Sequence, residues 1–207
     1  MSATCLTIVF AKAPQAGFAK TRLIPALGAQ GAADLALRFL NHAVGQALAA
    51  GLGEVELCCA PDARHASFSG LARAPGLRLT EQGEGDLGER MARAMQRGLA
   101  QHHKVLLIGT DAPALDAAGL RNAAAALDSH AAVFVPTVDG GYVLVGLRKP
   151  GSGVLPGIFT GMPWSTPQVM QRTREALQRE GIGYAEMAAV RDIDEPADLA
   201  HLPKHWL

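Results

Sequence analysis

The chain contains 207 residues, of which 49% are hydrophobic and 18% are charged, with 19 Lys and Arg residues against 19 Asp and Glu residues. This composition is that of a globular protein with a sizeable core rather than a disordered one, so we expect a single domain over residues 1–207. Because the formal net charge is zero, the chain lacks the basic excess of a general nucleic-acid or membrane-surface binder.

The N-terminal stretch and the cysteines indicate a cytoplasmic protein. The stretch MSATCLTIVFAKA has no basic leader and only a short apolar run, so we expect a strand there rather than a signal peptide. No apolar run approaches the ~20 residues that span a bilayer. Cys5, Cys58 and Cys59 have the spacing of neither a zinc site nor a disulfide framework, so we expect buried free thiols, with a redox or metal role as the alternative.

Short apolar runs and longer stretches of helical periodicity alternate along the chain. Strands are expected over residues 5–11, 55–60, 77–80, 104–111 and 182–187. Helices are expected over residues 29–50, from Asp86, over residues 116–128, from Thr166 to about residue 180 and, briefly, around Pro196. Two further apolar runs flank Asp139-Gly140-Gly141, a pattern that predicts a hairpin and hence at least one antiparallel strand.

This alternation predicts an α/β fold in three layers, with a mixed, mostly parallel sheet and helices on both of its faces. In open sheets of this kind, ligands bind outside the carboxyl ends of the strands. Three polar segments follow predicted strands and meet at that edge: the loop after the first strand, the segment EQGEGDLGE, and Asp111. We therefore expect the functional site there.

The first of these segments, FAKAPQAGFAKTRL, brings three cations into one loop. Lys12, Lys20 and Arg22 are separated by Pro14 and Gly17, which let the backbone turn and approach a ligand closely. Clustered Lys and Arg side chains neutralise and position a di- or triphosphate, so the loop predicts phosphate binding. The alternative is a solvated loop with ordinary surface lysines; the loop is not a Walker A motif.

Acidic residues near two later elements predict a metal site. Asp111 ends a buried strand in GTDAP, and Asp192 and Asp194 lie in RDIDEPADL. Proteins hold Mg²⁺ with one or two carboxylates together with phosphate oxygens and waters. The alternative for Asp111 and for Asp194 is that each caps the helix that follows it.

Two other segments are candidates for ligand contacts. Gln82, Gly85 and Gly88 surround a helix start, where an amide side chain reads a base or sugar edge and glycines allow close approach; a capped loop is the alternative. The DGGY turn, residues 139–142, is expected to line the mouth of the pocket unless it is only a tight turn. Trp164 either stacks on a ring or packs in the core.

Six ordered segments, spread over residues 6 to 200, carry a family resemblance: FAKAPQAGFAKTRL, QGEGDLGERM, IGTDAPAL, DGGYVLVGL, PWSTPQVM and DIDEPADL. Together they resemble the bacterial selenodomain- and radical-SAM-associated transferases. The resemblance implies the Rossmann-like fold of the nucleotide-diphospho-sugar transferases (GT-A) and a glycosyltransferase-like activity. The AKTRL segment is also similar to 2-phospholactate guanylyltransferase, a nucleotidyltransferase of the same fold.

The resemblance also implies roles for individual residues. Phosphate and nucleotide contacts would come from Lys12, Gly17, Lys20, Arg22, Gln82, Gly85 and Gly88. The acceptor side would be formed by Asp139, Gly140, Gly141, Tyr142 and Trp164, and the metal would be held by Asp111 and Asp194. Lys20, Arg22 and Asp111 are the residues expected to carry catalysis.

These expectations describe a transferase dependent on Mg²⁺ or Mn²⁺, which moves a group from a nucleotide or nucleotide-sugar to a small-molecule acceptor without nucleic acid or a membrane span. Glycosyl transfer is the first reading. The second is nucleotidyl transfer to a phosphorylated acceptor with release of pyrophosphate, and the third is a nucleotide-binding module without catalysis. The fold also allows a homodimer.

Overall fold

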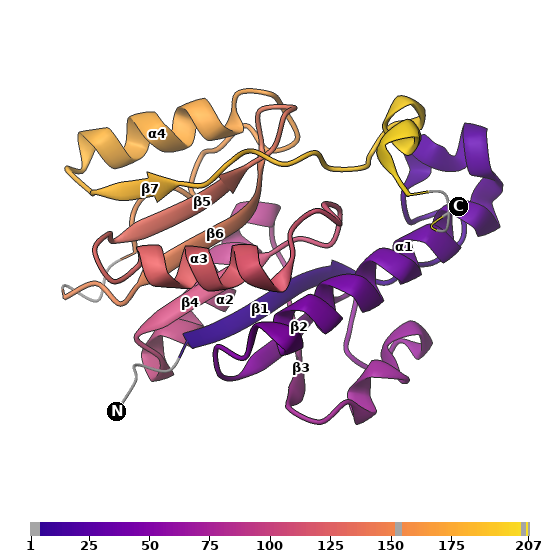
Figure 1. Cartoon of the computed structure of the whole chain (residues 1–207), viewed down its shortest axis with the longest axis horizontal. Helices are drawn as coiled ribbons and strands as arrows, with labels where there is room; N and C mark the ends of the chain where they lie inside the picture. Colours follow the sequence, from indigo (N-terminus) through magenta and orange to yellow (C-terminus); the bar gives the residue numbers. More distant parts are fainter. Residues whose placement is uncertain (1–4, 152–154, 204–205, 207) are drawn as a thin grey trace.

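The predicted strands form one seven-stranded sheet, in which β6 runs antiparallel and the other strands run parallel (Figure 1). The computed structural model describes residues 5–151, 155–203 and 206, so residues 1–4 of the N-terminal stretch lie outside it. In spatial order the strands are β3 (Leu77–Glu81), β2 (Val55–Ala60), β1 (Cys5–Lys12), β4 (Lys104–Ile108), β6 (Tyr142–Arg148), β5 (Ala132–Pro136) and β7 (Tyr184–Glu186). The predicted α/β fold with a mixed, mostly parallel sheet is confirmed.

Helices cover both faces of this sheet and complete the three predicted layers. One face is covered by α1 (Ile24–Ala50) and α3 (Ala117–Ala126), and the other by α2 (Leu87–Gln101) and α4 (Val169–Arg179). The 3₁₀ turns are η1 (Thr21–Leu23), η2 (Ala66–Phe68), η3 (Leu71–Arg73) and η4 (Pro196–His201). None of the described helices is both long and apolar enough to cross a lipid bilayer.

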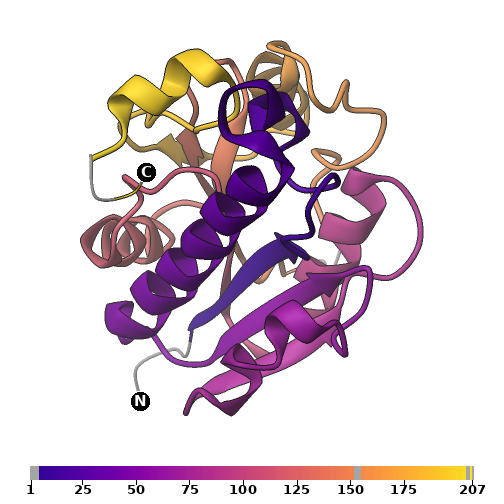
Figure 2. The same ribbon diagram turned by 90° about the vertical axis from the view of Figure 1, so that its right-hand side faces the viewer.

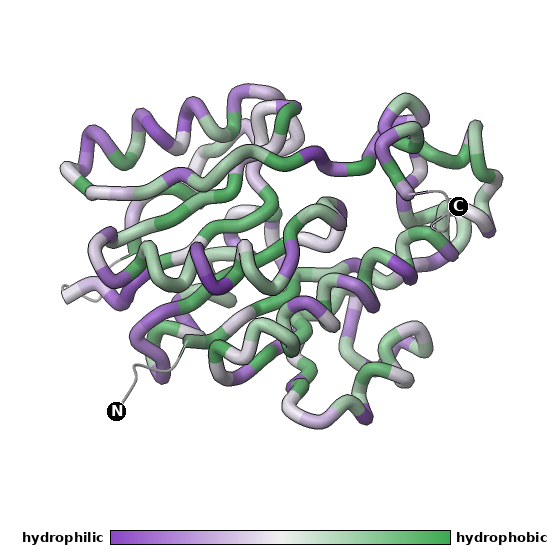
Figure 3. The backbone as a smooth tube through the Cα atoms, in the orientation of Figure 1, coloured by the Kyte–Doolittle hydropathy of each residue, from purple (hydrophilic) through white to green (hydrophobic). Residues whose placement is uncertain are grey.

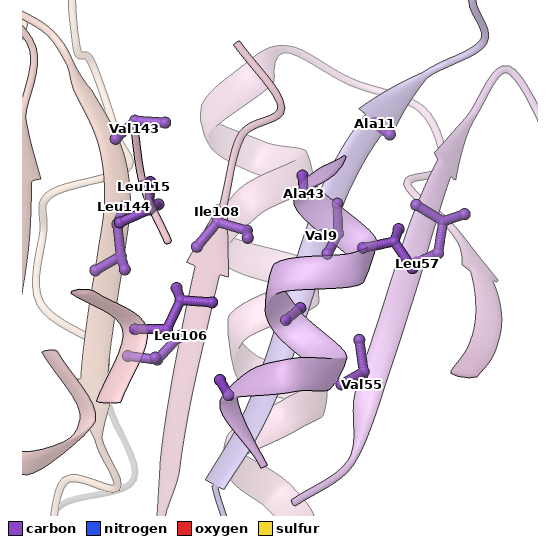
Figure 4. Packing of buried hydrophobic residues seen from close by; sticks show 14 of the residues in the cluster. Val9, Ala11, Ala43, Val55, Leu57, Leu106, Ile108, Leu115, Val143 and Leu144 are labelled. Atoms are coloured by element: carbon purple, nitrogen blue, oxygen red, sulfur yellow. The ribbon is translucent and has the colours of Figure 1, made fainter. Parts of the chain in front are cut away.

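Side chains that alternate along the strands supply two apolar cores. Val9 and Leu57 belong to the cluster under α1 and α3 (Figure 4), whereas Ile8 and Phe134 belong to the cluster under α2 and α4. Figure 3 shows the hydrophobic residues concentrated along the central strands. Each such side chain, once fully buried, contributes roughly 1.5–3 kcal/mol to folding, so both faces fix the sheet that supports the site.

The three cysteines lie in these cores as free, buried thiols, as predicted. Burial raises the pKa of Cys5 to about 11 and, together with neighbouring thiol and carboxyl groups, the pKa of Cys59 to about 12. Both thiols therefore stay protonated and unreactive at neutral pH.

A third, smaller apolar cluster joins the last part of the chain to the start of α1. Its buried members include Leu23, Phe39, Ile193 and Leu202. Figures 1 and 2 both show η4 beside the N-terminal end of α1, and Figure 1 shows that it lies far from β7. The segment between β7 and η4 therefore crosses the carboxyl edge of the sheet before it reaches this cluster.

Several boundaries differ from the sequence prediction. The strand predicted over residues 104–111 ends at Ile108, and residues 109–111 leave the sheet in a turn. The helix predicted from Thr166 begins at Val169, and Pro196 begins a 3₁₀ helix rather than an α-helix. The helix predicted over residues 29–50 matches the long, uninterrupted part of α1, because Gly28, with φ 71° and ψ 167°, breaks the helical conformation near the start of α1.

Candidate functional site

A cleft of about 620 Å³ lies where β1, β2, β3 and β4 end at the carboxyl edge of the sheet. This volume falls within the range of small-molecule sites, about 300–1,000 Å³. The residues predicted from the sequence that line it are Lys12, Lys20, Arg22, Gln82, Asp111 and Asp194. The structure thus brings together side chains from the opening loop, the β3–α2 segment, the end of β4 and the segment before η4.

Lys20 lies at the centre of the charged residues of the cleft. Its ammonium nitrogen lies 2.6 Å from the carbonyl oxygen of Ile193 and 3.0 Å from Oδ2 of Asp111. The same nitrogen lies 3.5 Å from Oδ1 of Asp194 and 5.7 Å from the ring centre of Phe39. Only 6% of the Lys20 side chain is exposed, so this cation is held by oxygen atoms and an aromatic face rather than by bulk water.

The two carboxylates around Lys20 come from distant parts of the sequence. Asp111 follows β4, whereas Asp194 lies in the segment between β7 and η4. The backbone N–H of Ile193 donates to the carbonyl oxygen of Asp111 at 2.9 Å, which joins the two segments directly. The side chains of Asp111 and Asp194 are 48% and 38% exposed, so each carboxylate can also reach a ligand.

Of the two late acids, Asp194 rather than Asp192 faces the cations. Asp194 pairs with Lys20 and accepts from Nη1 of Arg22 at 2.7 Å. Burial raises the pKa of Asp192, and the carboxylates of Asp139 and Asp194 raise it further, while Lys20 lowers it. The geometry therefore places Asp194 opposite Asp111, and it leaves Asp192 as a half-buried acid among other acids.

Further side chains that the sequence reading did not single out also line the cleft. Arg90, on the first turn of α2, donates from Nε to the carbonyl oxygen of Gly85 at 2.7 Å. Phe18 in the opening loop and Leu87 at the start of α2 are 64% and 39% exposed. For Phe18, the available sequence signal was a phenylalanine directly after Gly17 in the opening loop. For Arg90, nothing in the sequence distinguishes it from a solvated helix arginine.

Gln82 lines the cleft, and hydrogen bonds fix the orientation of its side-chain amide. Its side-chain nitrogen donates to the carbonyl oxygens of Ala11 at 3.0 Å and Cys58 at 3.1 Å. Carbonyl oxygens only accept hydrogen bonds, so the amide cannot be turned around. The side-chain oxygen of Gln82 can only accept hydrogen bonds, and the residue, which is 5% exposed, lines the cleft.

The predicted glycines serve mainly the backbone. Gly17 and Gly85 adopt positive φ values, 82° and 105°. A Cβ atom on Gly88 would lie 2.0 Å from the carbonyl oxygen of Phe159 and 2.8 Å from Nε1 of Trp164, so this glycine lets a distant segment pack against α2. Gly88 is thus buried under protein, and the described lining of the cleft does not include it.

A second cavity of about 260 Å³ adjoins the cleft, and both are lined by Arg22, Leu87, Ser165 and Asp194. The predicted acceptor-side residues that line it are Asp139, Gly141, Tyr142 and Trp164. Gly140 belongs to the same turn, and a Cβ atom there would lie 2.2 Å from the carbonyl oxygen of Pro167. The structure therefore gathers the predicted acceptor-side segments around one small cavity beside the larger one.

The side chains of this second cavity are held in defined positions. Oδ1 of Asp139 accepts from the hydroxyl of Thr137 at 2.5 Å and from the backbone N–H of Gly141 at 3.0 Å. The rings of Tyr142 and Trp164 meet edge to face, 6.3 Å apart. Burial raises the pKa of the Tyr142 phenol, so this group stays protonated at neutral pH.

Ser165 is an unpredicted residue at the junction of the two cavities. It lines both, and its φ of 63° is uncommon for a residue with a side chain. Such conformations cluster at functional sites. Nothing in the sequence PWSTP signals this backbone conformation.

The donor set of the cleft fits a hard divalent cation that also binds a ligand. Within the described ranges, no three His, Cys, Asp or Glu side chains are close enough to form a metal site by themselves. Asp111 and Asp194 nevertheless surround a cation, the Lys20 ammonium, together with a carbonyl oxygen. Two carboxylates with open coordination positions are typical of Mg²⁺ bound with phosphates.

Sequence comparison assigns the chain to a bacterial family. Residues 43–166, more than half of the chain, match the family described as "uncharacterized protein conserved in bacteria (DUF2064)". A comparison with curated proteins finds no match. Neither result bears on the selenodomain and radical-SAM association, which stays a prediction.

Solved structures confirm the fold. A protein from Desulfovibrio desulfuricans G20, assigned as a nucleotide-diphospho-sugar transferase, is 30% identical with a TM-score of 0.83, over 92% of this chain and 82% of that one. A nucleotidyl transferase from Methanothermobacter thermautotroptrophicus is 15% identical (TM-score 0.66, 98% and 97% covered). The 4-diphosphocytidyl-2C-methyl-D-erythritol synthase of Anaerococcus prevotii is 11% identical (TM-score 0.64, 96% of both covered). At the last two identities, the likeness concerns the fold alone.

Proposed function

We propose that this chain, which belongs to the bacterial family DUF2064, is a transferase that takes a nucleotide-diphospho-sugar as donor and passes the glycosyl group to a small acceptor. The donor would occupy the larger cavity and the acceptor the smaller one. The similarity to the Desulfovibrio protein, assigned as a nucleotide-diphospho-sugar transferase, favours this donor class.

The observation that carries the proposal is the charge distribution of the larger cavity. Lys12, Lys20, Arg22 and Arg90 face two carboxylates in one cleft, within a chain whose formal net charge is zero. This local excess of cations suits a polyphosphate, whose oxygen atoms Lys and Arg neutralise and orient. The aromatic and aliphatic surfaces of Phe18 and Leu87 would cover the less polar part of the nucleotide.

We further propose that Asp111 and Asp194 hold Mg²⁺ or Mn²⁺ together with the donor phosphates. When bound, such an ion stabilises negative charge that develops on the leaving phosphate. The chain itself would contribute Arg22, which lies between both cavities and hence next to the transferred group. No covalent nucleophile is required, because two substrates held side by side can react by direct displacement.

On the acceptor side, Asp139 is the residue we expect to receive the proton of an attacking hydroxyl. Thr137 and Gly141 both donate to Oδ1, and no described residue donates to Oδ2, which we therefore assign to the acceptor. The cavity of about 260 Å³ limits the acceptor to a small molecule or to the end of a larger one. The protonated Tyr142 phenol and the Trp164 ring would border it.

Nucleotidyl transfer is the second candidate, and one observation favours it. The four cations in the cleft would balance a triphosphate better than a diphosphate. In this reaction a phosphorylated acceptor attacks the α-phosphorus of an NTP and pyrophosphate leaves. The carboxylate of Asp139 in the smaller cavity argues for a neutral acceptor instead, since it would repel a phosphate placed beside it.

The test begins with thermal unfolding of the protein with NTPs and with nucleotide-diphospho-sugars, each with and without Mg²⁺. A ligand present at 100 times its Kd adds about 2.7 kcal/mol, which corresponds to roughly 5–10 °C in Tm at this size. Ligands that stabilise the protein are then incubated with small acceptors. Release of a nucleoside diphosphate with a glycosylated product supports the proposal, release of pyrophosphate supports the second candidate, and stabilisation by neither class refutes both.

Matched lysine variants show whether the cleft is the binding site. Lys12→Met removes a cation that lines the cleft, and we expect about tenfold weaker nucleotide binding, as for one lost charge-assisted contact. Lys149→Met is the control, because this lysine follows β6 at the opposite edge of the sheet. Equal affinities in both variants would place the nucleotide elsewhere.

A further inference from the structure

We infer that the ammonium group of Lys20 and the divalent cation of the proposed reaction compete for one set of oxygen atoms, in which the backbone carbonyl of Ile193 is a third ligand beside Asp111 and Asp194. The inference rests on the proposed function, because it concerns the same metal site. In the free protein, the ammonium group of Lys20 occupies this site.

Oxygen atoms of the chain surround the ammonium nitrogen of Lys20. In the part of the chain that the structure describes, three oxygen atoms lie within 3.5 Å of it: the carbonyl oxygen of Ile193 at 2.6 Å, Oδ2 of Asp111 at 3.0 Å and Oδ1 of Asp194 at 3.5 Å. Two carboxylate oxygens and one carbonyl oxygen are a set of ligands that hard divalent cations also take. A lysine ammonium, a compact point charge with three donors, satisfies the same set.

The backbone holds Lys20 in this position. Its φ of 46° and ψ of 47° are left-handed, a conformation that residues with a side chain adopt rarely. The carbonyl oxygen of Lys20 accepts from the N–H of Leu23 at 2.8 Å, and Leu23 is fully buried. The turn therefore sets the start of the lysine side chain, and the buried Phe39 ring borders its end.

The Ile193 carbonyl is equally well fixed. The Ile193 side chain is 2% exposed in the third apolar cluster, and its N–H donates to the carbonyl oxygen of Asp111. The carbonyl oxygen of Ile193 therefore has a fixed position relative to the Asp111 backbone. It can serve as a ligand whether the partner is the ammonium or a metal ion.

A divalent ion can bind these oxygen atoms only if the ammonium group leaves them. Mg²⁺ binds oxygen at 2.0–2.1 Å, so it cannot share these three oxygens with the ammonium. An ion that enters alone displaces a lysine that is 6% exposed and leaves it without its carboxylate partners. A polyphosphate supplies new oxygen atoms to the displaced ammonium, so the ion and the nucleotide favour each other, by the same factor in both directions.

The test measures Mn²⁺ binding by electron paramagnetic resonance without nucleotide. We expect Lys20→Met, which keeps an unbranched side chain and removes the charge, to bind Mn²⁺ at least tenfold more tightly than the wild type. Lys12→Met is the matched control, because it removes a cation from the same cleft but not from Asp111 and Asp194; we expect less than a threefold gain. Asp111→Asn in the Lys20→Met background should remove the gain.

A measurement on the wild type covers the case in which the variant does not fold. Acetylation of lysines, followed by mass spectrometry, should show Lys20 protected in the free protein and more reactive once Mn²⁺ alone saturates the site. Lys12, which is exposed, is the reference in the same sample. Unchanged protection of Lys20 with bound Mn²⁺ overturns the inference.

The outcomes separate this inference from the proposed function. If Lys20→Met fails to tighten Mn²⁺ binding while Asp111→Asn still abolishes Mn²⁺ binding with a nucleotide, competition is wrong and the metal site stands. If Mn²⁺ binding never depends on Asp111, with or without a nucleotide, the proposed metal site itself is wrong, and the inference falls with it.

Discussion

Two clusters of carboxylates and cations in this molecule differ in how deeply their carboxylates are buried. Within the sheet, Glu56 of β2 is fully buried; one carboxylate oxygen accepts from Arg78 at 2.7 Å and the other from Thr80 at 2.6 Å and from Arg97. In the cleft, by contrast, the side chain of the cation Lys20 is buried, whereas the carboxylates of Asp111 and Asp194 are partly exposed.

This difference separates a structural ion cluster from an exchangeable one. Both oxygens of Glu56 accept from protein donors, and the residue is fully buried, so a ligand cannot reach this carboxylate. The carboxylates of Asp111 and Asp194 are partly exposed, so a ligand can reach them while they still contact the protein. Similar residue types therefore stabilise the sheet in one place and form a candidate binding site in the other.

Glu56→Ala is the substitution with the largest expected effect on stability. It leaves Arg97, which is partly buried, without its carboxylate, and breaking a buried pair costs about 3–5 kcal/mol. Urea unfolding would measure the loss in the free energy of unfolding. Glu56→Gln keeps the shape and one acceptor and should lose less. A loss below 1 kcal/mol for Glu56→Ala would erase the distinction between the two clusters.

A matched pair of arginine variants compares the clusters directly. Arg97→Met removes one partner of the buried Glu56, and we expect a loss of about 2–3 kcal/mol. Arg22→Met removes a partner of Asp194 whose own side chain is 60% exposed, and we expect less than about 1 kcal/mol. Equal losses in urea unfolding would mean that the cleft cluster is as structural as the Glu56 cluster.

Asp192→Asn should produce a small gain in stability. The folded state raises the pKa of Asp192, so the charged form is disfavoured there, and its ionisation above the folded pKa costs stability at neutral pH. Removing this charge should raise Tm at pH 7 on the order of 1–3 °C. Below the pKa of Asp192 in the unfolded state, this carboxyl group is neutral in both the folded and the unfolded protein, so the gain should vanish. A gain that persists at pH 3 would rule out this electrostatic origin.

The sequence was most informative where one physical cause dominates. The apolar run of β4, the hairpin at Asp139-Gly140-Gly141 and the start of a helix at Asp86 were all predicted and are present; Asp86 and Glu89 cap α2 reciprocally. Each depends on residues close together in the chain. The strand ends depend on tertiary contacts, which is why β4 stops at Ile108 instead of Asp111.

Of the candidate site, too, the sequence predicted some features and missed others. That the cations and acids would meet followed from strand order, because the ends of parallel strands share one edge. The sequence could not reveal that Lys20 bonds the carboxylates, since this depends on Ile193 and on a left-handed backbone at Lys20. Ser165 and Arg90 were missed for the same reason: what places them in the cleft is packing, not pattern.

The hydrogen bond from Ile193 N–H to the Asp111 carbonyl oxygen has a consequence for how this protein can be re-engineered. It ties the two acids to each other through the framework, independently of the opening loop. The loop from Ala13 to Ala19 is held mainly by its own turns, through bonds such as Phe18 N–H to the Gln15 carbonyl oxygen at 3.0 Å. Loops of other composition could therefore be grafted between Lys12 and Lys20 to change which ligand the cleft binds, while the acid pair keeps its spacing.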